Sequence, residues 1–251
     1  MDTKLITRRR AIAAGVASLG GLILARRPTP LPPTYGSLLR AGDNLTYAAH
    51  RALFPRGSLA REYSAAEITP FPAVGTINPA TSVNNEVGDR YRELQRHAFA
   101  EWRLPVEGRV GRPLSLSLAD LRRFRPRTQI TRHTCEEGWT AIAQWTGVPL
   151  AAVLDAAGVL PSARFVVFHT YDGLVDCLDL VDALHPQTIL ACGMNGRELP
   201  VAHGAPLRLR VERQIGYKSH KYLRRIVVAD DFDDGGAEGD IRNGWAWYTG
   251  I

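Results

Sequence analysis

Hydrophobic and polar residues follow regular patterns from Trp102 onward, and most of these patterns have the two-residue period of β-strands. Alternating apolar residues bounded by turn formers predict strands over much of this region. The predicted strands lie at 102–118 (a pair that turns at Glu107-Gly108), 128–135, 164–173, 188–199 (a hairpin that turns at Asn195-Gly196), 205–213 and 223–232.

Apolar residues at helical spacing predict short helices between these strands. Ser117 is the predicted N-cap of a helix with Leu118, Leu121 and Phe124 on one face. The other predicted helices cover 138–147, 149–158 (begun by Pro149 and ended by Gly158) and 178–186. Strands dominate and helices are inserted between them, so we expect a mixed α+β fold rather than regular βαβ alternation.

The N-terminal part of the chain lacks such patterns. Four prolines within 27–36 predict an extended linker, and residues 37–95 are rich in turn formers without a clear period. We therefore expect three parts: a leader over 1–27, a linker and irregular segment over 28–74, and one folded domain over 75–251.

The leader has the pattern of an export signal. Arg8-Arg9 precedes an apolar run, Ala11–Ala25, that is rich in glycine and alanine and too short for a comfortable membrane span. This arrangement predicts export to the periplasm by the twin-arginine route. An ordinary secretory leader remains an alternative. Because no A-x-A cleavage site follows the run, an uncleaved N-terminal membrane anchor also stays open.

The charge of the chain is concentrated in that leader. Residues 1–27 hold +5 of the formal net charge of +6, so the rest of the chain is nearly neutral. A nearly neutral domain does not favour a nucleic-acid partner. We expect a small-molecule substrate instead.

Cys135 is the cysteine with the strongest candidate chemistry. The chain has three cysteines, and Cys177 and Cys192 lie in apolar strand patterns typical of buried small residues. A strand that gives way to a helix at Cys135 would lower the pKa of its thiol, whereas Glu136 and Glu137 would raise it. A metal cation would offset that negative charge. The spacing of these residues is equally compatible with a buried cysteine that has only a structural role.

No protein-only metal site accompanies this cysteine, because the chain has no C-x-x-C and no H-x-x-x-H. A metal bound by Cys135 would need an organic ligand and a surface for that ligand's anionic group. Arg208, Lys218 and Lys221 surround a Gly-Tyr turn with Ser219 beside it, which is typical of a phosphate site. A run of solvated basic residues is the alternative.

The combined segments "CEEGW…QWTGVPL", "GAPLRL" and "GYKSHKYL" resemble the sulfite-oxidase superfamily of molybdopterin-dependent oxidoreductases. They are most similar to the exported bacterial branch with the periplasmic methionine-sulfoxide reductase catalytic subunit. The resemblance covers about residues 75–251. It implies a mixed-sheet molybdopterin-binding domain with one molybdenum on one pyranopterin, and it implies that Cys135 is the only protein ligand to that metal.

The resemblance also implies a set of cofactor-binding positions, which in this chain are Asn84, Thr170, His203, Arg208, Lys218, Ser219, His220 and Lys221. His203 replaces the family's asparagine, and Val87-Gly88 replaces its Tyr-Glu pair. Tyr171, Asp172 and Trp139 are our candidates for the substrate side. The arginine-rich stretch that follows the cysteine in sulfite oxidases is "EEGWTAIAQ" here, which disfavours the sulfite anion on charge grounds.

We therefore expect an exported molybdenum oxidoreductase that transfers oxygen atoms, with S-oxide or N-oxide reduction favoured over sulfite oxidation. The chain has no haem-attachment motif, so electrons must come from a separate partner, a membrane haem protein or a soluble cytochrome. Two alternatives remain open. One is a metal-free enzyme with Cys135 as nucleophile and His133 as base, and the other is a non-catalytic exported binding domain of the same fold.

Overall fold

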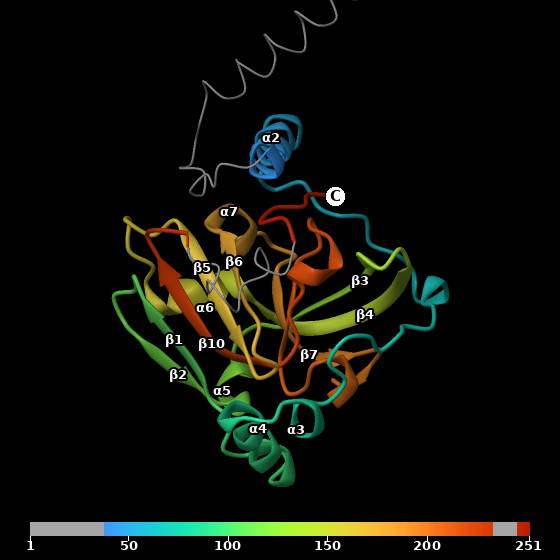
Figure 1. The fold of residues 1–251 in the computed structure, drawn as a ribbon, viewed down its shortest axis with the longest axis vertical. Helices are drawn as coiled ribbons and strands as arrows, with labels where there is room; N and C mark the ends of the chain where they lie inside the picture. Colours follow the sequence, from blue (N-terminus) through green and yellow to red (C-terminus); the bar gives the residue numbers. More distant parts are fainter. Residues whose placement is uncertain (1–37, 233–244) are drawn as a thin grey trace, which may run out of the picture.

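The computed structural model describes residues 38–232 and 245–251. It contains two sheets with short helices around them (Figure 1). The predicted leader with its twin arginines, the proline-rich linker and residues 233–244 lie outside the described residues. Within the described ranges, no helix combines the length and the apolarity needed to cross a bilayer.

The first sheet has the strand order β2-β1-β10-β5-β6. Its strands are β1 (Leu104–Gly108), β2 (Leu114–Leu116), β5 (Phe165–Thr170), β6 (Val175–Asp179) and β10 (Leu223–Ala229). β1 and β10 run parallel, whereas the other neighbours pair antiparallel. The predicted strand pair at 102–118 is confirmed as β1 and β2, with its turn beginning after Gly108.

The second sheet has the order β3-β4-β7-β8, and β9 pairs with the other side of β7. Its strands are β3 (Arg127–Thr134), β4 (Thr140–Pro149), β7 (Ile189–Met194), β8 (Arg197–Glu198) and β9 (Arg208–Arg210). The turn between β7 and β8 has φ angles of 50° at Asn195 and 73° at Gly196, as the predicted Asn-Gly hairpin turn requires.

The helices are short apart from two near the N-terminal end of the described chain. They are α2 (Leu38–Leu53), α3 (Pro79–Ser82), α4 (Glu86–Arg96), α5 (Leu118–Leu121), α6 (Leu150–Ala157) and α7 (Leu180–Ala183), with 3-10 turns at Ala65–Glu67, Val201–His203 and Gly216–Lys218. Ser117 caps α5 in a capping box with Asp120. α6 ends at Gly158 with a φ of 68°, so the predicted start and stop of this helix are confirmed. The α+β class is confirmed as well.

The main hydrophobic core joins both sheets to the helices around them. Fully buried aromatic and aliphatic side chains from β1, α6, β5 and β10 fill it, among them Leu104, Leu150, Phe168 and Ile226. Burial of each such side chain contributes roughly 1.5–3 kcal/mol. This core fixes the ends of the strands, and the loops that leave those ends build the cavity described below.

The predicted helix at 138–147 is wrong, because this segment is the strand β4. Ala141, Ala143 and Trp145 point inward and alternate with more exposed residues, which is the two-residue period of a strand. Alanine masks that period because it is also the strongest helix former. At Gly147 the strand is irregular, and a Cβ there would lie 2.1 Å from the carbonyl oxygen of Leu190.

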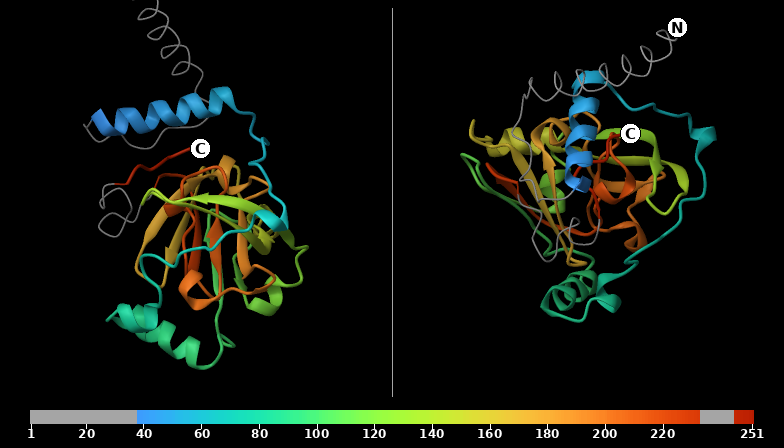
Figure 2. Two further views of the ribbon diagram at one scale, coloured as in Figure 1. Left: turned by 90° about the vertical axis from the view of Figure 1, so that its right-hand side faces the viewer. Right: turned by 45° about the horizontal axis from the view of Figure 1, so that its top comes forward.

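The expectation of an irregular segment before residue 75 is also wrong at 38–53, where the 16-residue helix α2 forms. α2 lies at one end of the molecule beside the C-terminus, and α3 and α4 lie at the opposite end (Figure 1). The connecting segment, residues 54–78, runs along the outside of the domain between these ends (Figure 2). It carries Phe71, which reaches the cavity.

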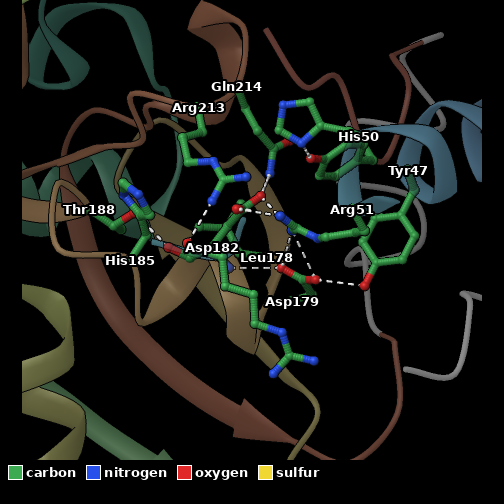
Figure 3. Close-up of polar contacts among 12 residues, drawn as sticks. Tyr47, His50, Arg51, Leu178, Asp179, Asp182, His185, Thr188, Arg213 and Gln214 are labelled. Atoms are coloured by element: carbon green, nitrogen blue, oxygen red, sulfur yellow. Dashed lines mark hydrogen bonds and ion pairs between the residues drawn. The ribbon is translucent and has the colours of Figure 1, made fainter. Parts of the chain in front are cut away.

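α2 binds the body of the protein through polar side chains. Arg51 contacts the carboxylates of Asp179 at 3.0 Å and Asp182 at 2.9 Å, and all three side chains are buried (Figure 3). The hydroxyl of Tyr47 donates to Asp179 at 2.9 Å, and that of Tyr248 lies 2.6 Å from Nδ1 of His50. α2, the start of α7 and the C-terminal residues are therefore held together by one buried polar cluster.

Candidate active site

A cavity of about 310 Å³ lies where loops from both sheets meet. The turn between β3 and β4 contributes Cys135 and Trp139, and the turn between β5 and β6 contributes Asp172. Three further segments complete the wall: 71–76, 202–208 and 216–221, with Trp245 at one side. Eight of the residues selected from the sequence line this cavity: Cys135, Trp139, Asp172, His203, Arg208, Ser219, His220 and Lys221.

Cys135 lies in a hairpin turn, not at the start of a helix. Its backbone N–H donates to the carbonyl of Trp139 at 2.9 Å, and its carbonyl accepts from Gly138 at 3.1 Å. Burial raises the pKa of the Cys135 thiol to about 11, and the Glu136 carboxylate 3.4 Å from Sγ adds to this shift. The expected lowering of this pKa by helix amides is therefore wrong. A neighbouring cation is needed to favour the thiolate.

His133 lies on the inward face of β3, two residues before Cys135, but does not form a Cys–His pair. Its Nδ1 lies 2.7 Å from Nη1 of Arg210. Burial, together with Arg210 and Arg208, lowers the pKa of His133 to about 2. A histidine in this state is a poor general base, so the geometry does not support the metal-free Cys135 nucleophile.

The opposite wall of the cavity is cationic. Arg208 is buried; its Nη1 and Nη2 donate to the carbonyls of His203 at 3.0 Å and Ser219 at 2.8 Å, and its Nε is buried without a hydrogen-bond partner among the described residues. Burial and the nearby Arg210 lower the pKa of Arg208 to about 9, so it stays charged at neutral pH. Lys221 donates to the carbonyls of Val74 at 2.9 Å and Thr76.

Lys218 faces the interior, and His220 lines the cavity but contacts the same interior carboxylate. The ammonium of Lys218 lies 2.6 and 2.8 Å from the two carboxylate oxygens of Asp176, and its side chain is fully buried. His220 Nε2 lies 2.8 Å from the same carboxylate. Lys218 does not line the cavity, although the sequence placed it with Arg208 and Lys221. Lys218 points inward because it pairs with Asp176, a residue that the sequence analysis did not select.

Three other selected residues lie outside the cavity wall. The Thr170 hydroxyl closes the β5–β6 turn, donating to the carbonyl of Leu174 at 3.0 Å and accepting from its N–H at 2.9 Å. Tyr171 is buried in the core, with its ring centroid 5.4 Å from that of Tyr91. Asn84 is exposed just before α4. Asp172 does line the cavity, and its Oδ1 is buried without a hydrogen-bond partner among the described residues.

An aromatic group forms the wall near Cys135. The ring of Phe71 lies 5.1 Å from His133, 5.6 Å from Trp139 and 5.5 Å from His203. Phe71 belongs to a segment without periodicity, so the sequence offered no signal for it. Arg208, Arg210 and Glu212, by contrast, alternate along "RLRVE", and that spacing could have indicated one charged face.

The residues present fit a metal carried by an anionic organic ligand. No group of three or more His, Cys, Asp or Glu side chains within 38–232 and 245–251 could hold a metal ion by itself. The buried, unpaired Nε of Arg208 is a donor for an anion, and Lys221 lies in the same wall. Cys135 supplies one soft ligand on the other side of the cavity.

Comparison with known proteins gives a consistent result. The model of the oxidoreductase molybdopterin binding domain family matches residues 92–236. A candidate protein-methionine-sulfoxide reductase subunit of Azospira oryzae, YedZ1, is 32% identical over 244 residues, which are 96% of this chain and 87% of that protein. The protein-methionine-sulfoxide reductase catalytic subunit MsrP of Pseudomonas syringae pv. tomato is 28% identical, over 73% of this chain and 60% of its own length.

The solved structure of the sulfane dehydrogenase SoxCD from Paracoccus pantotrophus has a similar fold. It aligns with a TM-score of 0.52 and 24% identity, over 55% of this chain and 40% of that one. The family match covers more than half of the chain, and the similarity to YedZ1 spans nearly all of it. The chain therefore belongs to the oxidoreductase molybdopterin binding domain family and is a molybdopterin-dependent oxidoreductase of the sulfite-oxidase type, related to the methionine-sulfoxide reductases.

Proposed function

We propose that this enzyme reduces S-oxides to thioethers. The balanced reaction is R₂SO + 2H⁺ + 2e⁻ → R₂S + H₂O, in which sulfur is reduced and its oxygen leaves as water. The names of the two curated relatives support this substrate class. The observation that carries the proposal is the aromatic and acidic lining on the Cys135 side of the cavity, made of Phe71, Trp139, Glu136 and Glu137.

This lining suits a neutral sulfur compound better than an anion. Thioether sulfur makes favourable contacts with aromatic rings at about 5 Å. The carboxylates of Glu136 and Glu137 repel sulfite, and the arginine in the cavity wall, Arg208, is engaged on the opposite side. The site is therefore selective for an uncharged S=O group near Cys135.

The residues have separate tasks in this proposal. Cys135 would hold the metal as a thiolate, while Arg208, Ser219 and Lys221 would bind the anionic end of the cofactor. The molybdenum cofactor, when bound, supplies the two-electron oxygen-atom exchange. Phe71 and Trp139 orient the substrate and exclude water from the Cys135 side.

Export and the electron supply are part of the same proposal. Arg8-Arg9 and the apolar run Ala11–Ala25 favour the twin-arginine route to the periplasm. Electrons would come from a separate protein, either a membrane haem protein or a soluble cytochrome. The names of the relatives, a reductase subunit and a catalytic subunit, support a protein that works with another chain.

The test measures molybdenum per chain by elemental mass spectrometry, in wild type and Cys135→Ser from a molybdenum-replete host. The same preparations are assayed with reduced methyl viologen as electron donor and methionine sulfoxide or trimethylamine N-oxide as acceptor. A matched assay offers sulfite and ferricyanide.

We expect about one molybdenum per wild-type chain, S-oxide reduction by wild type, and loss of turnover in Cys135→Ser. A wild-type protein that carries molybdenum but oxidises sulfite faster than it reduces S-oxides would contradict the substrate class. Full turnover in Cys135→Ser would contradict the assignment of the ligand.

A further inference from the structure

The protonation of His133 is fixed by its neighbour. Nη1 of Arg210 lies 2.7 Å from Nδ1 of His133 in the protein interior. A guanidinium group can only donate hydrogen bonds, so Nδ1 must be the acceptor. A neutral imidazole that accepts at Nδ1 carries its proton at Nε2. His133 therefore presents an N–H donor at Nε2.

The ring is also held in place. Arg210 forms two hydrogen bonds to Glu212, at 3.2 and 2.8 Å, and Glu212 in turn accepts from Gln129 at 3.0 Å. The guanidinium of Arg210 lies 4.5 Å above the ring of Trp145. A buried and satisfied network of this kind holds its members in one arrangement.

Aromatic rings also pack around the imidazole. Phe71 and Trp139 approach the ring with centroid distances of 5.1 and 5.5 Å. Gly216 leaves empty the space beside Nε2 that a Cβ would fill, because a Cβ there would come within 2.5 Å of Nε2. Both His133 and Gly216 line the cavity, so the donor is held at its wall.

His133 Nε2 makes no hydrogen bond to any part of the chain that the structure describes, whereas the polar groups around it are acceptors or are engaged. Glu136 and Glu137 present carboxylates, and the indole N–H of Trp139 donates to Glu137 at 3.0 Å. An S-oxide oxygen is a strong acceptor that requires a donor. Among these residues of the Cys135 side, His133 has the donor that is still available.

We propose that His133 Nε2–H donates a hydrogen bond to the oxygen of the substrate S-oxide and thereby selects the oxidised substrate over the thioether product. This inference rests on the proposed S-oxide reduction and names the residue that recognises its oxygen atom. A neutral donor supplies the hydrogen bond without attracting anions such as sulfite, which agrees with the acidic surroundings.

Two substitutions distinguish a hydrogen bond from His133 to the substrate from a purely structural role in which His133 holds Arg210 in place. In His133→Asn, the amide oxygen can replace Nδ1 as the acceptor for Arg210, but the donor at the Nε2 position is lost. In His133→Gln, the longer side chain can place an amide N–H near the Nε2 position, but it no longer matches the acceptor at Nδ1. A donor role predicts the larger defect in His133→Asn, and a purely structural role predicts the larger defect in His133→Gln.

The first measurement is steady-state kinetics of the holoenzymes with methionine sulfoxide, together with molybdenum content. A neutral hydrogen bond of about 0.5–1.5 kcal/mol corresponds to roughly a two- to twelvefold change in affinity. We expect KM to rise by roughly this factor in His133→Asn at unchanged molybdenum content, with His133→Gln between it and wild type. The reverse order of the two variants would overturn the proposal.

The second measurement is binding to the oxidised holoenzymes without an electron donor, followed by tryptophan fluorescence because Trp139 lies against His133. We expect His133→Asn to weaken binding of methionine sulfoxide and to leave binding of methionine unchanged. Equal weakening of both ligands would overturn the proposal. A His133-dependent preference for the sulfoxide in an enzyme that fails to reduce it would support the donor role and contradict only the proposed reaction.

Discussion

Nζ of Lys218 lies 2.6 Å from Oδ1 of Asp176, and neither side chain reaches the surface. Burial alone would raise the pKa of Asp176, but the charges of Lys218 and His220 lower it. The basic segment 208–221 therefore has two functions. Arg208 and Lys221 line the cavity, whereas Lys218 neutralises a carboxylate in the interior.

Asp176→Asn is expected to destabilise the fold strongly. The substitution leaves the Lys218 ammonium buried without its counter-charge, which typically costs about 3–5 kcal/mol. Urea unfolding of the two proteins measures this difference. The control is Glu93→Gln, which removes an exposed ion pair with Arg96 and should change stability by less than about 1 kcal/mol. Equal stability of Asp176→Asn and wild type would contradict the buried ion pair.

The separation of these lysines could not be predicted from the sequence. Lys218 and Lys221 are three residues apart, yet the 3-10 turn at Gly216–Lys218 directs one inward and leaves the other in the cavity wall. Asp176 is 42 residues from Lys218 in the sequence and lies in β6, where the apolar pattern around Cys177 does not indicate a charged partner. Pairings of this kind depend on the tertiary fold, and local spacing contains no information about them.

Secondary structure was predictable where one period dominated. α6 was predicted with both ends because Pro149 and Gly158 mark them, and the β7–β8 turn was predicted because Asn195-Gly196 requires positive φ angles. α2 was not predicted, and most of the residues that it turns inward, among them Asn44 and His50, are polar, whereas Leu45 is exposed. Apolar residues do recur at helical spacing in this segment (Ala41, Leu45, Ala48 and Ala52), so the period could have indicated the helix but not that its polar side faces the protein.

Retention of the cofactor should weaken as pH rises through about 8. Burial and the charge of Arg208 lower the pKa of Lys221 to about 8 in the protein without cofactor. Below this pH Lys221 is an ammonium that attracts the anionic end of the cofactor, and above it the side chain is neutral. Dialysis at pH 7 and pH 9, followed by molybdenum determination, measures the effect, and wild type should lose more metal at pH 9.

Two variants of Lys221 complete this experiment. Lys221→Arg stays charged at both pH values, so its molybdenum content should depend less on pH. Lys221→Met lacks the charge at both, so its content should be low throughout. If wild type and Lys221→Met lose molybdenum in parallel between pH 7 and 9, another group is responsible for the dependence.

Gly216→Ala should impair the site by displacing His133. The added Cβ would lie 2.5 Å from Nε2 and 2.6 Å from Cε1 of the imidazole, and 2.9 Å from the carbonyl oxygen of Thr134. Because Arg210, Phe71 and Trp139 hold the ring, its movement should cost roughly 1–3 kcal/mol. Thermal unfolding and KM for methionine sulfoxide measure the two consequences.

The matched control is Gly42→Ala in α2, where nothing lies within 4 Å of the added Cβ. Alanine is the better helix former by about 1 kcal/mol, so this variant should be at least as stable as wild type. Its KM should not change, because Gly42 lies outside the cavity wall. A normal KM in Gly216→Ala would show that the ring has more room than its contacts indicate.

Arg51→Met should release α2 from the body of the protein. The guanidinium joins the carboxylates of Asp179 and Asp182, and its loss leaves two buried acids that repel one another. Removal of one partner from such a cluster typically costs about 3–5 kcal/mol. Hydrogen exchange should therefore be faster in Leu38–Leu53 than in wild type, while α6, which packs in the main core, keeps its protection.

The effect of Arg51→Met should shrink as pH falls. Burial and the neighbouring Asp182 already raise the pKa of Asp179 with Arg51 present, and its removal raises that pKa further. A carboxyl whose pKa is higher in the folded than in the unfolded protein contributes stability at low pH, and this contribution is lost as pH rises through the folded pKa. Urea unfolding at pH 7 and pH 5 should therefore show a larger difference from wild type at pH 7. If the difference in unfolding free energy is the same at both pH values, Arg51 does not compensate the charges of Asp179 and Asp182.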